Sequence, residues 1–316
     1  MSFLPDDPPS GEPVIFDRPQ SIGDLLTRSF QIYRARFAGL VGLAALFLVP
    51  YALISGLLAG QISASTETVM RSFQTGGPFP MGAAVSYMTS FFLIGFLGLV
   101  VNAAIAPALI YQIGEFLHGR AISLGQSLRG GLSRFWAYMG MSIVQGIVFI
   151  LVAAVVIVIV VMLVMTMIAG ADLASGKGPA LGVVGFLLIF SLAVVLISIP
   201  WLFLAARWIA AMPALVLERR GPIESLGYSW RLTRGNTWRA IGLIVLLTIL
   251  GIVLSLPIMF VRGILAVALS PGPSNLFVSS AIGTMATTFV QILWLPFTFV
   301  VYTLFYYDLR ARKEEP

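Results

Sequence analysis

Four charged residues stand beside long apolar segments and are the side chains in this sequence best placed to do chemistry. They are Arg207, Glu218, Asp308 and Arg310. Charges at the edge of a hydrocarbon layer lose hydration and gain most by pairing. We therefore expect these four to lie near one another, as an interfacial charge cluster at the ends of two membrane helices.

Arg207 has two interpretations. It follows the apolar run that begins at Trp201, so its guanidinium either reaches out to the membrane surface or forms an anion site between helices that takes a lipid headgroup. Glu218 is eleven residues further on, and one continuous helix would place both residues on the same face. Pro213 lies between them and leaves that continuity open.

Residues suited to catalysis or metal binding are scarce. The chain has no cysteine, which excludes thiolate nucleophiles, disulfides and cysteine-bound metals, and its one histidine is His118. Thirteen acidic residues are spread over 316 positions, and no phosphate loop, nucleophile elbow or dinucleotide-binding motif occurs. We expect a protein that is not an enzyme and holds no cofactor or metal.

The elements that carry these charges must be membrane helices. Hydrophobic residues make up 59% of the chain and charged residues 10%, against about 45–50% and 25% in a soluble domain. The formal charge of +6 comes from arginines next to apolar spans rather than on a soluble basic face. Anionic lipid headgroups are thus the expected partners, and nucleic acid is not.

Long intervals without charge locate the spans. Each holds about 20 residues suited to crossing a hydrocarbon core of ~30 Å, and the unbroken apolar run Phe149–Met165 has none of the alternation of a barrel strand. The prediction is an all-α polytopic protein. Its six transmembrane helices are expected near 37–60, 84–112, 140–169, 180–206, 240–261 and 281–306.

Before each odd-numbered span lies an amphipathic segment with a helix-start signal. The segments are 21–36, 123–136 and 222–235, and apolar residues recur in them at spacings of three and four. We expect three cytoplasmic interfacial helices and three parallel repeats, with units of approximately 21–120, 121–220 and 221–310.

Charge asymmetry predicts the orientation. Sixteen Lys and Arg residues fall on the side of the N-terminus and three on the other side, which places both termini in the cytoplasm. Residues 1–20 form a proline-rich polar tail that we expect to be disordered, with no cleavable signal peptide. Residues 21–310 then make the membrane domain, and 311–316 a cytoplasmic tail.

Two strings carry a resemblance to a known family. Residues 213–234, PALVLERRGPIESLGYSWRLTR, and residues 307–310, YDLR, resemble the membrane domain of bacterial glycerophosphoryl diester phosphodiesterases, and the resemblance extends over residues 15–313. It implies a multi-pass protein of the bacterial inner membrane. In two-domain members the chemistry belongs to a soluble barrel that follows the membrane part, and the six residues after Arg310 leave no room for one.

The sequence thus favours a non-enzymatic integral inner-membrane protein that contacts anionic lipid, and possible further partners are a second copy of itself or another membrane protein. The alternative is a transporter or a lipid-handling protein of the flippase or scramblase kind. Parallel repeats and prolines near the spans motivate this alternative.

Overall fold

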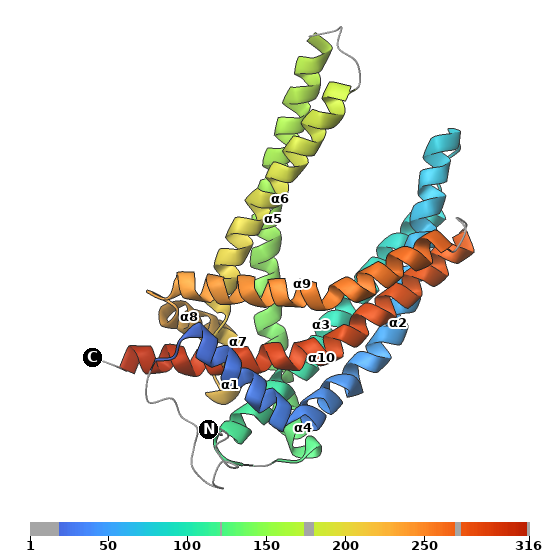
Figure 1. Ribbon diagram of the computed structural model, residues 1–316. Coiled ribbons are helices and arrows are strands. Elements are labelled where there is room, and N and C mark those ends of the chain that lie inside the picture. The colour runs from blue at the N-terminus through green and yellow to red at the C-terminus, as the bar shows by residue number, and fades with distance from the viewer. Residues whose placement is uncertain (1–18, 121, 174–179, 269–272, 315–316) are drawn as a thin grey trace, which may run out of the picture.

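The computed structural model describes residues 19–120, 122–173, 180–268 and 273–314. Within these ranges it describes the side chains outside 163–190, 193, 265–275 and 314. The described backbone forms ten helices (Figure 1). They are α1 (Ile22–Ala35), α2 (Phe37–Thr75), α3 (Met81–Leu117), α4 (Leu124–Leu132), α5 (Phe135–Leu173), α6 (Ala180–Trp208), α7 (Ala211–Leu217), α8 (Pro222–Leu232), α9 (Thr237–Ala268) and α10 (Pro273–Glu314).

Within the described ranges, six helical segments are long and apolar enough to cross a membrane, in agreement with the all-α, six-span prediction. They are Phe37–Thr75, Met81–Leu117, Phe135–Met162, Val194–Leu217, Thr237–Ile264 and Leu276–Lys313. The first exceeds the predicted span 37–60 by 15 residues at its C-terminal end, because polar residues between Gln61 and Thr75 continue the same helix beyond the apolar stretch.

Short helices gather at one end of the molecule, where both ends of the described chain also lie (Figure 1). We call this the short-helix end; it consists of α1, α4, α7 and α8. The C-terminal ends of α2, α5 and α9 and the N-terminal ends of α3, α6 and α10 lie away from it (Figure 1).

Three of the short helices begin at the predicted signals. The Ser21 hydroxyl accepts the backbone N–H of Asp24 at 3.1 Å, and Ser123 and Gln126 form a reciprocal capping box. The third begins with Pro222 in the first turn, where its missing N–H costs nothing. The threefold repeat and the placement of these helices in the membrane plane stay predictions.

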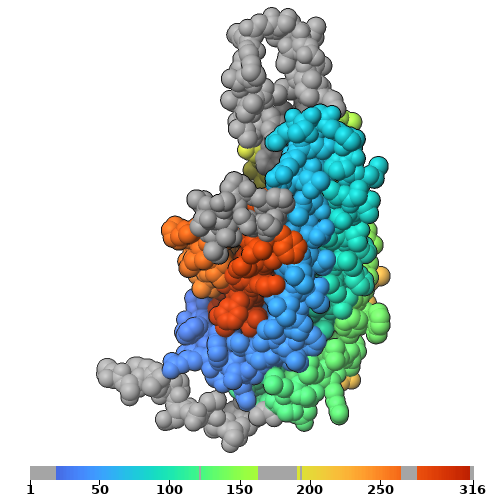
Figure 2. All heavy atoms as spheres, turned by 90° about the vertical axis from the view of Figure 1, so that its right-hand side faces the viewer, coloured from blue at the N-terminus to red at the C-terminus, as the bar shows by residue number. Residues whose placement is uncertain are grey.

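The first and last spans lie side by side. α2 packs along α3 on one side and along α10 on the other, and Figure 2 shows α10 between α2 and α9 on one face. The pair α5–α6 extends away from the other spans (Figure 1).

The densest part of the core lies at the short-helix end. Ala103–Ile110 of α3 is buried throughout, as are most residues of α10 from Phe299 to Leu309. α4 crosses α3 so closely that a Cβ on Gly131 would come within 2.3 Å of the Ala108 backbone. Glycine is therefore required at position 131, because a larger residue would separate the two helices.

Candidate functional site

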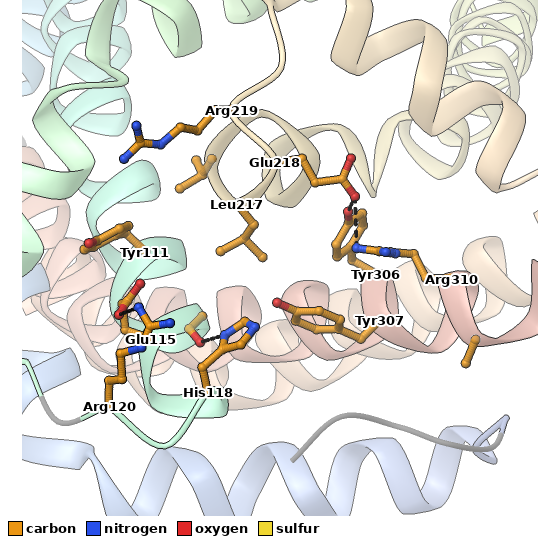
Figure 3. A pocket seen from close by; sticks show the side chains of 13 residues that line it. Tyr111, Glu115, His118, Arg120, Leu217, Glu218, Arg219, Tyr306, Tyr307 and Arg310 are labelled. Atoms are coloured by element: carbon orange, nitrogen blue, oxygen red, sulfur yellow. Dashed lines mark hydrogen bonds and ion pairs between the residues drawn. The ribbon is translucent and has the colours of Figure 1, made fainter. Parts of the chain in front are cut away.

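A polar cavity of about 450 Å³ opens at the short-helix end, between α3, α7 and α10 (Figure 3). Its walls carry charged, phenolic and small apolar groups. The lining residues are Tyr111, Gly114, Glu115, His118, Arg120, Val216, Leu217, Glu218, Arg219, Tyr306, Tyr307, Arg310 and Ala311.

A break in the chain brings Glu218 to this cavity. α6 ends at Trp208, and the separate helix α7 runs from Ala211 to Leu217 with most of its residues buried. Arg219 then adopts a left-handed backbone conformation, with φ of 56°, before α8 begins. A residue with a Cβ pays a steric cost there, and the resulting sharp turn leaves Glu218 at the end of α7, directed at α10.

Glu218 is the centre of a network of charged and hydrogen-bonded groups. Its Oε1 lies 3.1 Å from Nη1 of Arg310 and also accepts the hydroxyl hydrogen of Tyr306, while its Oε2 lies 2.6 Å from Nε of Arg220. Arg220 in turn contacts Glu224 at 2.8 Å, so the network joins the α7–α8 turn to α10.

The network sets the protonation of Glu218. Burial alone raises the pKa of its carboxyl group. Hydrogen bonds from Tyr306 and Arg220, together with the charges of Arg220 and Arg310, outweigh burial and hold the pKa below its ordinary value. The Glu218 carboxylate is therefore ionised at neutral pH and serves as a fixed negative charge.

Asp308 belongs to a second group of contacts. Its side chain is 0% exposed, and its carboxylate lies 3.2 Å from Arg239 of α9 and 3.0 Å from Arg312 of α10. The backbone N–H of Gln20 donates to it at 2.7 Å. The Gln20 carbonyl accepts from both arginines, so the segment that precedes α1 is fastened across α9 and α10.

Arg207 lies apart from both carboxylates. Its guanidinium carbon is 5.3 Å from the ring centre of Phe203 and 4.8 Å from that of Trp230. Among the described residues Arg207 has no ion pair with an acidic group. Of the four residues predicted to cluster, the structure joins Glu218 to Arg310 directly, gives Asp308 other partners and leaves Arg207 among aromatic rings.

The wall opposite Glu218 has its own ion pair. Arg120 lies 3.1 Å from Glu115, and Nδ1 of His118 lies 2.7 Å from the Gly114 carbonyl oxygen, which makes Nδ1 the protonated nitrogen. The His118 ring also meets the edge of Tyr307, with centroids 6.4 Å apart. His118 is thus oriented by its neighbours at the rim of the cavity (Figure 3).

The cavity brings basic and acidic side chains together, and two of its three arginines are paired with carboxylates on its walls. Arg120, Arg219 and Arg310 offer guanidinium donors to the cavity. Across the described ranges, no group of three or more His, Cys, Asp or Glu residues comes together as a metal site would require.

The sequence did not identify three members of the Glu218 network, Arg220, Glu224 and Tyr306. The short spacings among Glu218, Arg220 and Glu224 gave a signal, because residues two and four positions apart near a helix start can reach one another. Tyr306 gave no local signal, because 88 residues separate it from Glu218.

Comparisons with known proteins agree with the resemblance seen in the sequence. The chain matches neither a curated protein nor a solved structure. The family match leaves out residues 1–179, most of which the resemblance also covered, and it includes α6 to α10 with the charged residues of both carboxylate networks but without Gln20. Residues 180–316 match the model of the membrane domain of glycerophosphoryl diester phosphodiesterase, and the six apolar helices among the described residues indicate an integral membrane protein.

Proposed function

We propose that the chain is a non-enzymatic protein of the bacterial inner membrane that binds anionic lipid headgroups at its short-helix end, with that end and both termini in the cytoplasm. The observation that carries the proposal is the distribution of basic residues. Among the described residues, Arg71 and Arg262 are the basic side chains near the helix ends that lie away from the short-helix end, and all other arginines and the lysine belong to the short-helix end. The positive-inside rule places such an end in the cytoplasm.

The short helices have the side-chain pattern of interfacial helices. In α1, Leu25 is buried while Arg28 and Arg34 are exposed, and the exposed ring of Phe30 lies beside them. In α8, Leu226 is buried and Arg231 is exposed. Basic residues next to exposed apolar side chains favour a helix in the headgroup layer, where it attracts anionic lipid.

The three short helices that precede α2, α5 and α9 support three parallel repeats, each with a short helix and two spans. Similar capping signals at Ser21, Ser123 and Gly221 support the same reading. Basic faces that recur three times around one end suit a broad contact with lipid, and the same surface would hold a second copy or a membrane partner.

Lipid preference tests the proposal. Purified protein in a neutral detergent should melt at a higher temperature with added phosphatidylglycerol than with the same concentration of phosphatidylcholine. Replacing Arg28 and Arg34 together by glutamine should reduce this difference, since each basic residue near an anionic surface contributes about 1 kcal/mol. Equal stabilisation of the wild-type protein by both lipids would refute the proposal.

A lipid-handling or transport role is the second candidate, and the polar cavity of about 450 Å³ favours it. Vesicles that contain the protein and fluorescent lipid in both leaflets would show it. Loss of fluorescence from both leaflets on addition of an external reductant would support scrambling, and loss limited to the outer leaflet would support the binding role.

A further inference from the structure

Arg207 has surroundings unlike those of the arginines in the two carboxylate networks. It lies one residue before the end of α6, and its backbone carbonyl oxygen accepts the Ser229 hydroxyl at 2.7 Å, which fastens α6 to α8. Its guanidinium lies beside the rings of Phe203 and Trp230. The position of the charge is thus fixed by packing rather than by a carboxylate.

Most of the hydrogen-bonding capacity of Arg207 is not used by the residues that the structure describes. A guanidinium has five N–H donors, and toward those residues the side chain makes one long bond of 3.4 Å, from Nη1 to the Trp230 carbonyl oxygen. Its Nε is enclosed and has no hydrogen-bond partner among the described residues. An enclosed donor without a partner is unfavourable, so an acceptor that reached this guanidinium would be stabilised.

A groove of about 320 Å³ opens beside this guanidinium. It is lined by Phe203, Arg207, Gly235, Thr237, Trp238 and Ile241, which belong to α6, to the first turns of α9 and to the turn before it. All but Gly235 fall within two of the membrane-spanning segments. The groove therefore lies at the edge of the hydrocarbon region rather than in the polar cavity described above.

The groove combines one charged end with apolar walls. Phe203 is 40% exposed and Trp238 is 85% exposed, and both sit where acyl chains would pass. The first turn of α9 also faces the groove through Thr237, and the N–H groups of a first helical turn favour a negative charge. A phosphate with attached acyl chains matches this pattern of a cation next to apolar surface.

We propose that this groove, which we call the Arg207 groove, is a discrete site for one anionic phospholipid. Its phosphate would accept hydrogen bonds from the Arg207 guanidinium, and its acyl chains would lie against Phe203, Trp238 and Ile241. The absence of a pairing carboxylate among the described residues favours a lipid with net negative charge over a zwitterionic one. The inference rests on the proposed function, because it requires the short-helix end to lie in the headgroup layer.

Binding to two variants tests the site. Native mass spectrometry of the full chain, titrated with phosphatidylglycerol, should show that Arg207→Gln weakens the tightest binding step by about tenfold or more, as expected for the loss of a charge-assisted hydrogen bond. Arg71→Gln is the matched control, since it removes the same charge from an exposed position near the end of α2, away from the short-helix end, and it should change that step by less than about twofold. Equal effects of the two substitutions would refute a discrete site.

Further measurements distinguish a lipid from soluble phosphate as the ligand. They also distinguish failure of the Arg207 groove from failure of the proposed function. Millimolar inorganic phosphate should neither stabilise the protein nor displace the lipid, and displacement that depends on Arg207 would show a site for soluble phosphate instead. If the wild-type protein prefers phosphatidylglycerol and Arg207→Gln keeps the full preference, the groove is refuted while the proposed function stands. If the wild-type protein shows no preference, both fail.

A fluorescence measurement gives a test that does not depend on altering Arg207. Brominated phosphatidylglycerol should quench tryptophan emission of the wild-type protein more than brominated phosphatidylcholine does, because Trp238 forms one wall of the groove. Trp238→Phe changes an exposed side chain and should reduce this extra quenching without unfolding the protein, with the remainder coming from Trp230, which also lies beside the Arg207 guanidinium. Extra quenching of the same size in wild type and Trp238→Phe would refute the proposal.

Discussion

The guanidinium of Arg310 lies 3.1 Å from the carboxylate of Glu218, and this contact joins the end of α7 to the last turns of α10. The same carboxylate accepts the hydroxyl hydrogen of Tyr306, one turn earlier on α10. Arg310 and Tyr306 of α10 therefore hold the turn that follows Glu218. The left-handed backbone conformation of Arg219 in that turn is strained.

Glu218→Gln should lower the melting temperature of the protein in detergent. The substitution keeps the shape of the side chain but leaves Arg220 and Arg310 without their shared negative charge, at a cost of about 1–3 kcal/mol. Glu224→Gln is the control, because its side chain is largely exposed, and it should cost no more than about 0.5 kcal/mol. Similar losses in both variants would show that Glu218 has no special role.

Tyr306→Phe removes a single hydroxyl group from the same network. It should cost roughly 1–2 kcal/mol alone and less in a Glu218→Gln background, because the two side chains act on the same contact. Melting temperatures of the two single variants and the double variant measure this coupling. Strict additivity would mean that the hydroxyl and the carboxylate stabilise the fold independently.

The lowered pKa of Glu218 predicts a dependence of stability on pH. The folded protein binds the Glu218 proton more weakly than the unfolded chain does, so the stabilisation is fully present above the unfolded pKa of about 4.3. It is lost as the pH falls through the lower pKa of the folded state. The melting temperatures of wild type and Glu218→Gln should therefore converge in acid, and a difference that stays constant with pH would contradict this.

Asp308→Asn should be among the most destabilising single substitutions in the chain. It leaves two arginines next to a buried group that no longer carries a charge, and breaking a buried ion pair costs about 3–5 kcal/mol. Gln20→Pro tests the same network from the other side, because it removes the N–H that donates to Asp308. Gln20→Ala keeps that N–H and should melt close to the wild type; equal melting of the two Gln20 variants would exclude a role for the hydrogen bond.

Gly131→Ala should destabilise the contact between α4 and α3. The added methyl group would meet the Ala108 backbone, which cannot turn aside as a flexible side chain can. Gly125→Ala lies in the same helix with nothing within 4 Å and should be neutral or slightly stabilising, by up to about 1 kcal/mol, since alanine favours helix. Thermal melting of the two variants makes a direct comparison.

The sequence was sufficient for the spans and for most helix starts, because hydropathy and capping are local properties. It did not resolve the chain between Arg207 and Glu218, where α6 ends at Trp208 and α7 begins at Ala211. Pro213 indicated that the helix could be interrupted there, and it lies in the first turn of α7, where its missing N–H costs nothing. The hydrophobicity of both helices is continuous, so the sequence did not show at which residue α6 ends.

The pairing of the charged residues was also hard to predict, because it depends on how the helices pack. Arg312 lies four residues after Asp308 on one helix and could have been paired with it from spacing alone. The backbone of Gln20 could not, because 288 positions separate it from Asp308 and a main-chain N–H leaves no mark in the sequence. Long-range contacts of this kind depend on which spans lie side by side.

The packing of α10 along α2 has a consequence for biosynthesis. The first span meets its main neighbour only after residues 76–272 have been made, which takes on the order of ten seconds or more at about 5–20 residues per second. During that interval the small residues of α2 that α10 later covers, such as Gly56 and Gly60, face lipid or the insertion machinery. Assembly of this protein is therefore completed from its C-terminal helix, and a ribosome that stops before α10 leaves a first hairpin that is inserted in the membrane without its partner.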